Sequence, residues 1–385
     1  MIRLAIINSN IVSITPHTKK GTEIFDYILI RQLAKQAKRR NLKITAFASG
    51  DSNLPVTTQS INYKSSLSDK EIGVEHHKIF ELALISKALS QQNDFDIYHI
   101  NIGNGDVVLP FVPFIRKPIL VTMHGSFLED KYSKKYLSLF KNLKNFYFVS
   151  LSSAQRQPLP KLNYVATIQH GIDSKRMWQF NSIGGGHIVW AGRAIREKGI
   201  SELFHVIKKV KKPARLFPLI KDETPHWMKR LTESTHISIP LLSIHKPLSH
   251  HALAVEFQHS KLFLFPIQWE EPFGLVLIEA LACGTPVVAF ARGSVTEVIE
   301  DGVTGFIVNP SSEDIRGNFI IKKCGVEGLC EAIERIYAMS ESEYKAMRQQ
   351  CRERVEKYFT VQQMTKQYIE IYKSVIKDWK QNTNG

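Results

Sequence analysis

Short apolar runs alternate along this chain with longer stretches in which apolar residues recur at helical spacing. In the first half, such runs predict strands at 2–7, 44–48, 97–100, 119–123 and 147–151, and periodic stretches predict helices at 22–40 and 76–90. In the second half, the same patterns predict strands at 188–190, 214–217, 236–239, 262–267, 287–290 and 306–308, and helices at 199–210, 223–234, 249–258, 274–283, 328–338, 341–358 and 361–380. This alternation is typical of parallel sheets covered by helices, so we expect an α/β fold built from doubly wound sheets.

The alternation lapses between residues 171 and 186, and Gly184, Gly185 and Gly186 follow one another there. Because consecutive glycines form flexible connections, we place a linker at 177–186, between a first domain at 1–176 and a second domain that begins at 187. A length of 385 residues is enough for two domains that each bury a core.

Composition narrows the class of protein. Hydrophobic residues make up 43% of the chain and charged residues 23%, as is ordinary for a globular protein. There is no apolar run of about 18 residues, and the stretch 1–10 is too short and too uncharged for a signal peptide. The four cysteines have no metal-like spacing. We therefore expect a reduced, cytoplasmic protein.

The net charge of +15 is unevenly distributed. Residues 1–175 carry 23 Lys and Arg against 13 Asp and Glu, which is a net charge of +10. Such an excess favours an anionic partner, and no recognisable nucleic-acid module accompanies it. The stretch 131–148 has aromatic residues on one face and lysines on the rest, so we expect a helix that either lies on an anionic membrane or exposes a solvated face of the core.

The residues with the clearest chemistry lie in the stretch 261–309. A strand is followed there by a polar bend, and a helix then begins near Gly274, so that Glu271 precedes the helix start and Glu279 lies in its second turn. Unpaired N–H groups at a helix start suit a diphosphate, and Glu279 could accept hydrogen bonds from sugar hydroxyls. The alternative is an ordinary crossover helix with solvated acids. Glu270 is interpreted as a solvent-exposed neighbour of Glu271.

A second stretch, 187–199, favours the ligand-binding interpretation over the ordinary crossover helix. An apolar strand ends there, and Arg193 and Lys198 follow it. Cations at the carboxyl end of a parallel strand lie where open α/β sheets bind ligands, and together with the helix start near Gly274 they would compensate a diphosphate.

In order and spacing, these residues resemble the retaining glycosyltransferases of family 4, which have the GT-B fold. The resemblance covers Gly192-Arg193, Lys198-Gly199, the Glu271-Pro-Phe-Gly-Leu stretch with Glu279, and the Gly293 and Asp301-Gly302 turns. It implies two Rossmann-like doubly wound domains facing across a cleft. The first would be the acceptor side, the second (187–360) would bind the nucleotide sugar, and a last helix (361–385) would cross back to the first.

The resemblance also implies roles for individual residues. His124, after the strand 119–123, would line the sugar pocket, and Glu271 would contact the hydroxyls of the transferred sugar. The nucleotide would be bound by Gly21, Arg193, Lys198, Phe273, Gly274, Leu275 and Glu279. Similar enzymes usually carry two glycines at the start of the first helix, whereas this chain has Lys20 before Gly21. That lysine suggests an anionic acceptor.

We therefore expect a hexosyltransferase that moves a sugar from a nucleotide diphosphate sugar to a hydroxyl acceptor, with retention of anomeric configuration. The resemblance implies no metal and no cofactor, the nucleotide sugar being a substrate. The alternatives are a sugar-nucleotide epimerase or phosphorylase on the same fold, or a catalytically silent sugar-nucleotide-binding protein. A dinucleotide-dependent oxidoreductase is disfavoured, because the loop after the first strand lacks the G-x-G-x-x-G pattern. Further expectations are an anionic acceptor or the inner membrane surface as a partner, and no nucleic acid; the oligomeric state stays open.

Overall fold

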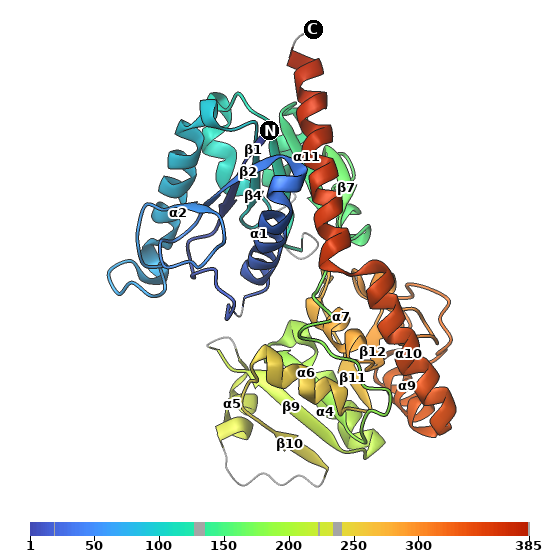
Figure 1. The fold of residues 1–385 in the computed structure, drawn as a ribbon. Coiled ribbons are helices and arrows are strands. Elements are labelled where there is room, and N and C mark those ends of the chain that lie inside the picture. The colour runs from blue at the N-terminus through green and yellow to red at the C-terminus, as the bar shows by residue number, and fades with distance from the viewer. Residues whose placement is uncertain (19, 127–134, 222–223, 234–240, 384–385) are drawn as a thin grey trace. The chain divides into compact units, whose positions relative to one another are not determined.

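The chain folds into two compact units in the computed structural model, which describes all residues except 19, 127–134, 222–223, 234–240 and 384–385 (Figure 1). The first unit comprises Met1–Gly171 together with Val361–Gly385, and the second comprises Ile172–Thr360. Each unit has its own parallel sheet with helices on it. The predicted α/β class with two doubly wound sheets is therefore confirmed.

The first unit contains a seven-stranded sheet in the order β3-β2-β1-β4-β5-β6-β7. All neighbouring strands pair in parallel, and Asn8 at the end of β1 lies beside Asn101 at the end of β4. The strands are β1 (Ile2–Asn8), β2 (Leu42–Phe47), β3 (Thr57–Gln59), β4 (Ile97–Asn101), β5 (Ile119–Thr122), β6 (Phe146–Ser150) and β7 (Tyr164–Thr167).

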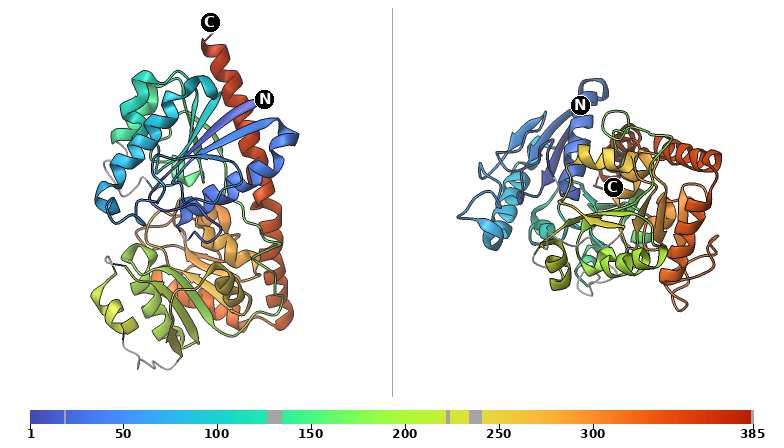
Figure 2. Two further views of the ribbon diagram at one scale, coloured as in Figure 1. Left: turned by 60° about the vertical axis from the view of Figure 1, so that its left-hand side comes forward. Right: turned by 90° about the horizontal axis from the view of Figure 1, so that it is seen from below.

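Helices cover both faces of this first sheet. On one face, Phe25 and Leu29 of α1 (Gly21–Arg40) pack with Met364 and Tyr368 of α11 (Val361–Thr383) and with β1. On the other face, α2 (Gly73–Ser90) packs with a 3₁₀ helix, η2 (Asp106–Phe114). Figures 1 and 2 show α11 running along the first sheet, beside α1 and β7. The other 3₁₀ helices of this unit are η1 (Gln92–Asp94), η3 (Ser138–Asn142) and η4 (Ala154–Arg156).

The second unit contains a six-stranded parallel sheet in the order β10-β9-β8-β11-β12-β13. Its strands are β8 (Ile188–Arg193), β9 (Ala214–Leu219), β10 (Leu242–Ile244), β11 (Leu262–Phe265), β12 (Val287–Phe290) and β13 (Gly305–Val308). Its helices are η5 (Arg196–Lys198), α4 (Ile200–Val210), α5 (His226–Glu233), α6 (His250–Gln258), α7 (Leu275–Ala282), α8 (Val295–Val298), α9 (Gly325–Ala338) and α10 (Glu341–Tyr358).

Residues 177–186, predicted to be a flexible linker, belong to the second unit. Trp178 is 3% exposed, and the fully buried guanidinium of Arg348 in α10 donates to the backbone carbonyls of Asn181 (2.7 Å), Ser260 (3.1 Å) and Cys283 (3.1 Å). A buried arginine is compatible with folding only when its donors are satisfied in this way. Gly184 and Gly185 are closely packed, since a Cβ atom would lie 2.6 Å from Arg348 at the first and 1.7 Å from the His259 carbonyl oxygen at the second, whereas Gly186 is exposed.

One further expectation differs from the structure, one falls outside the described residues, and two strands were not predicted. The helix expected at 131–148 is wrong beyond residue 142, because a 3₁₀ helix ends there and β6 begins at Phe146; residues 131–134 lie outside the described part. The strand expected at 236–239 also lies outside it, and β10 follows at Leu242. The short strands β3 and β7 were not predicted, because neither contains a buried residue and so neither forms an apolar run. Within the described residues, no helix has both the length and the apolar character needed to cross a bilayer.

Candidate active site

Three loops of the second unit meet at one edge of its sheet. They follow β8, β11 and β12, which are neighbours in the sheet order. Because these strands are parallel, their carboxyl ends lie at the same edge, where open α/β sheets bind ligands. Arg193 is the last residue of β8, Lys198 is the last residue of η5 in the connection that follows, and Glu271 lies in the loop after β11.

A close backbone contact joins the first two loops. Gly199 has a φ of +71°, and a Cβ atom there would lie 1.7 Å from the carbonyl oxygen of Pro266. Only glycine fits such an approach without a shift of the backbone. The Gln268 N–H also donates to the Glu197 carbonyl at 2.8 Å. Lys198 is thereby placed beside the bend that carries Glu271.

A second close contact joins the bend to the loop after β12. Gly293 has a φ of +56°, and a Cβ atom there would lie 2.3 Å from the carbonyl oxygen of Glu271. That same carbonyl accepts from the Ser294 N–H at 2.9 Å, and the Ser294 hydroxyl donates to the Phe273 carbonyl at 2.7 Å. The backbone of the bend is therefore held from both sides.

Glu270 anchors this bend, so the expectation that it is a solvent-exposed neighbour is wrong. Its side chain is 13% exposed, and its Oε2 accepts from the Gly293 N–H at 2.6 Å. Its Oε1 lies 2.7 Å from Nη1 of Arg316 and 3.2 Å from Nη1 of Arg292. Asp314 pairs with both arginines, at 2.7 and 3.1 Å. Two carboxylates and two guanidiniums thus compensate one another and fix the start of the bend.

Glu271 makes a different set of contacts. Its Oε2 lies 2.6 Å from Nζ of Lys198 and accepts from the indole Nε1 of Trp269 at 2.9 Å. Both charged side chains are largely buried, with 17% of Lys198 and 11% of Glu271 exposed. The Trp269 ring centroid lies 4.6 Å from Nζ of Lys198 and 5.9 Å from Cζ of Arg193. The structure therefore brings Arg193, Lys198 and Glu271 together around one indole ring.

Helix α7 starts directly after this cluster. Gly274 is its N-cap residue, with a φ of +79° and a ψ of +73°. The first-turn N–H groups of a helix have no acceptor within the helix and carry partial positive charge, so an anion is stabilised there. The Phe273 side chain is 1% exposed and packs against Phe359, so this residue can offer a ligand only its backbone.

Glu279 lies in the second turn of α7 and is 7% exposed. Burial raises the pKa of its carboxyl to about 8, so the group holds its proton at neutral pH. Within the described part of the chain it has no hydrogen-bond donor or cation as a partner. Its contacts thus differ from those of Glu271, although both were predicted to bind the donor.

His124 and Gly21 belong to the first unit. His124 follows β5. Its backbone N–H donates to the Gly103 carbonyl at 3.1 Å, and its ring centroid lies 5.0 Å from that of Phe25. Burial lowers the pKa of His124 to about 3, so the imidazole is neutral, and its Nε2 has no hydrogen-bond partner within the described residues. Gly21 is the first residue of α1, one turn before Phe25, and a Cβ atom there would meet nothing within 4 Å.

The described residues contain no cluster of three or more His, Cys, Asp or Glu side chains that could hold a metal ion. Two carboxylates at Asp-x-Asp spacing, Asp94 and Asp96, lie just before β4 and could be considered as metal ligands. Asp96 accepts from the backbone N–H and from Nη2 of Arg3, both at 2.8 Å. A carboxylate already paired with a guanidinium in this way is a poor metal ligand.

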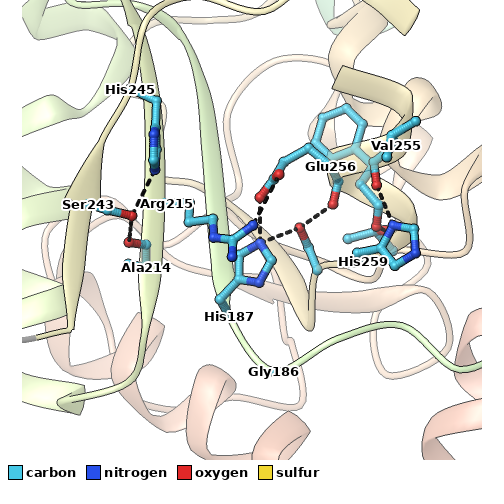
Figure 3. Close-up of polar contacts among 12 residues, drawn as sticks. Gly186, His187, Ala214, Arg215, Ser243, His245, Val255, Glu256 and His259 are labelled. Carbon is cyan, nitrogen blue, oxygen red and sulfur yellow. Dashed lines mark hydrogen bonds and ion pairs between the residues drawn. The ribbon is translucent and has the colours of Figure 1, made fainter. Parts of the chain in front are cut away.

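A hollow of about 490 Å³ lies at the opposite edge of the second sheet, at the amino ends of β8, β9 and β10. Figure 3 shows two of its lining residues, His187 and Arg215, with their common partner Glu256. Nε2 of His187 lies 2.5 Å from Oε1 of Glu256, and Nη1 of Arg215 lies 3.4 Å from Oε2 of the same residue. These contacts tie α6 to the ends of two strands. None of the residues predicted to bind the donor lines this hollow.

Two contributors to the site were missed in the sequence. Trp269 is the one aromatic residue in the polar bend, and its position two residues before Glu271 was a usable signal. Glu270 gave no signal of its own, because Arg292 and Arg316 are 22 and 46 residues away in the chain. Such pairing follows only from the packing of the loops.

Comparisons with known proteins place this site in a family. The family model described as Glycosyl transferases group 1 matches residues 184–358. Over 188 residues, the chain is 27% identical to an uncharacterized 41.2 kDa protein from the cps region of Klebsiella pneumoniae. Over 86 residues, it is 41% identical to D-inositol 3-phosphate glycosyltransferase of Mycobacterium bovis. These alignments cover 49% and 22% of this chain, and only 46% and 18% of the two relatives' own length.

Two solved structures resemble the whole chain. Sucrose-phosphate synthase of Thermosynechococcus elongatus has a TM-score of 0.73 at 18% identity, covering 97% of this chain and 99% of its own. HepE of Anabaena, solved in complex with UDP and glucose, has a TM-score of 0.68 at 16% identity, covering 97% and 100%. At such identities the likeness concerns the fold. This chain thus has the GT-B fold of glycosyltransferases, and its second unit is a glycosyl transferases group 1 domain.

Proposed function

We propose that this protein is a retaining glycosyltransferase that moves a hexosyl unit from a nucleotide diphosphate sugar to a hydroxyl acceptor without a metal ion. The observation that carries the proposal is the cluster of Lys198, Glu271 and Trp269 directly before the start of α7. It combines a cation, unpaired helix N–H groups and a carboxylate. These are the groups needed to hold a diphosphate next to a sugar.

Transfer requires that negative charge growing on the departing diphosphate be stabilised. In the proposed mechanism, Arg193, Lys198 and the backbone N–H groups of Gly274 and Leu275 supply this stabilisation from fixed positions. Preorganised donors of this kind lower the barrier because they need not reorient as the bond breaks. No protein nucleophile is invoked: the acceptor hydroxyl attacks from the face that the diphosphate leaves, and a phosphate oxygen takes its proton.

The substrates are proposed from the same residues. Glu279 would accept hydrogen bonds from the donor ribose, Glu271 from the transferred sugar, and His124 would contact that sugar. The complex of HepE with UDP and glucose supports a uridine nucleotide as the first donor to test. Lys20, which stands before Gly21 where similar enzymes carry a second glycine, supports an anionic acceptor, and such an acceptor would replace its present contact with Glu23 (3.7 Å). Two of the similar proteins, D-inositol 3-phosphate glycosyltransferase and sucrose-phosphate synthase, are named for phosphorylated compounds, which agrees with such an acceptor.

Lys198→Ala should lower the single-turnover transfer rate about 100-fold at saturating donor, the scale seen when one preorganised donor is lost. Donor affinity should fall less than the rate, because charge on the leaving oxygen grows only as the bond breaks. Rapid-quench transfer and calorimetric donor binding measure the two quantities. Lys208→Ala, which removes an exposed lysine of α4, is the matched control. A preserved rate with collapsed affinity would show that Lys198 only binds. Epimerised donor or sugar phosphate as the product would favour the alternative activities.

Donor binding should depend on the protonation of Glu279. The free protein holds a proton there below a pKa of about 8, whereas a carboxylate that accepts two ribose hydroxyls must be ionised. Affinity should therefore rise as the pH increases from 6 to about 8, and binding at pH 7 should release roughly one proton. Calorimetry in buffers of different ionisation enthalpy measures this release. Glu279→Gln should abolish both effects, and a wild-type protein that releases no proton would contradict the assignment.

The basic first unit is proposed to draw the protein to an anionic surface. Leu139 is 62% exposed, and Lys135, Lys141 and Lys144 around it are exposed as well. Binding to vesicles with 30% anionic lipid should weaken with added salt and with the change of these three lysines to glutamine, since each cation near the surface contributes about 1 kcal/mol. Lys208, Lys209 and Lys211 of the second unit, changed together, serve as the charge-matched control. Equal sedimentation with neutral and anionic vesicles would exclude such a role.

A further inference from the structure

Two groups that the proposed mechanism assigns to different parts of the donor are bound to each other in this structure. Lys198 would hold the diphosphate and Glu271 the sugar hydroxyls, yet Nζ of Lys198 lies 2.6 Å from Oε2 of Glu271. Neither group can serve the donor fully until this ion pair opens. The site must therefore exchange one set of charge contacts for another when the donor arrives.

We propose that the Lys198–Glu271 ion pair is a latch that makes the site select an intact nucleotide diphosphate sugar over the free nucleoside diphosphate. The inference rests on the proposed function and extends it to substrate selection and product release. The latch opens at low cost only when a diphosphate and a hydroxylated sugar arrive together. The diphosphate then replaces Glu271 as the partner of Lys198, and the sugar hydroxyls replace Lys198 as the partner of Glu271.

The burial of the pair gives the latch its strength. The Lys198 and Glu271 side chains are 17% and 11% exposed, so a separated charge would be only partly hydrated. A buried ion pair is strongly destabilised when one partner is removed, because the other charge remains without compensation. If a nucleoside diphosphate without a sugar draws Lys198 away, the Glu271 carboxylate keeps only the Trp269 N–H, at 2.9 Å, as a side-chain donor among the described residues.

An intact donor avoids this cost. Sugar hydroxyls donate to Glu271 as the diphosphate takes Lys198, and the Trp269 N–H, which donates to Glu271 at 2.9 Å, does not have to move. Binding of the two halves is therefore coupled, and such coupling is reciprocal between the ligand groups. Once the sugar has been transferred, the hydroxyls are gone, the ion pair can re-form, and the nucleoside diphosphate leaves more readily.

The test uses Glu271→Gln, which keeps the shape of the side chain and removes its charge. Calorimetry first identifies which of UDP, GDP and ADP binds the wild-type protein, and that nucleotide is then titrated into the variant. Its affinity should rise about tenfold, within the usual range of coupling energies, because Lys198 no longer has to leave a carboxylate. The affinity for the matching nucleotide sugar should not rise, because the variant also loses the acceptor of the sugar hydroxyls.

Two controls separate a latch from simple charge repulsion. Glu197→Gln removes an exposed carboxylate that is adjacent to Lys198 in the chain, and it should leave nucleotide affinity unchanged. In a Lys198→Met background, Glu271→Gln should also have no effect. An equal rise in nucleotide affinity in the Lys198→Met background, or in the Glu197→Gln variant, would overturn the latch. The cause would then be a general reduction of negative charge near the site.

A separate measurement does not depend on a Glu271 variant that folds. Lys198→Met alone should weaken binding of the intact nucleotide sugar more than binding of the nucleoside diphosphate, because only the sugar frees the lysine fully. Equal losses for the two ligands would overturn the latch while the proposed donor class stands. Failure of the wild-type protein to bind any of the three nucleotides or their sugars would overturn the proposed function together with it.

Discussion

The site in the second unit depends on backbone-to-backbone packing of three loops. Gly199 lies against the Pro266 carbonyl and Gly293 against the Glu271 carbonyl, at distances that leave no room for a side chain. Interiors packed this densely transmit small displacements, so a larger residue at either position would move the charged groups relative to one another. The positions of Lys198 and Glu271 therefore follow from close packing before any electrostatic attraction acts.

Electrostatics then divides the adjacent glutamates between two tasks. Glu270 is compensated by Arg292 and Arg316 and holds the bend in place, whereas Glu271 is paired with Lys198 and accepts a hydrogen bond from Trp269. One carboxylate thus holds the bend in place, and its neighbour is the one that we propose to contact the sugar. Glu279 differs from both, because burial raises the pKa of its carboxyl and suppresses its charge.

Periodicity in the sequence was enough to predict most strands and helices. In long segments such as 341–358, the local spacing of apolar residues is sufficient to indicate a helix. It failed where structure depends on distant residues. The segment 177–186 was interpreted as a linker from its glycines, but the buried guanidinium of Arg348 fixes it in the second unit. The helix expected at 131–148 stops early because β6 pairs with β5 from Phe146 onward.

In the candidate site too, local sequence patterns were predictive, whereas contacts between distant residues were not. Arg193, Lys198, Glu271 and Gly274 were predicted from motif spacing, and the structure brings the first three around Trp269. The task of Glu270 was misjudged, because its arginine partners come from later loops. The state of Glu279 was not predicted either, since a carboxyl pKa depends on burial, which spacing alone does not reveal.

The most direct measurement is a crystal structure of the protein with a bound nucleotide diphosphate sugar. Its diphosphate oxygens should lie about 3 Å from the backbone N–H groups of Gly274 and Leu275 and from Nζ of Lys198. Glu271 should then contact sugar hydroxyls in place of Lys198. A diphosphate bound elsewhere, for example beside Arg215 at the opposite edge of the sheet, would contradict the proposed donor site. An intact Lys198–Glu271 pair in the complex would contradict it as well.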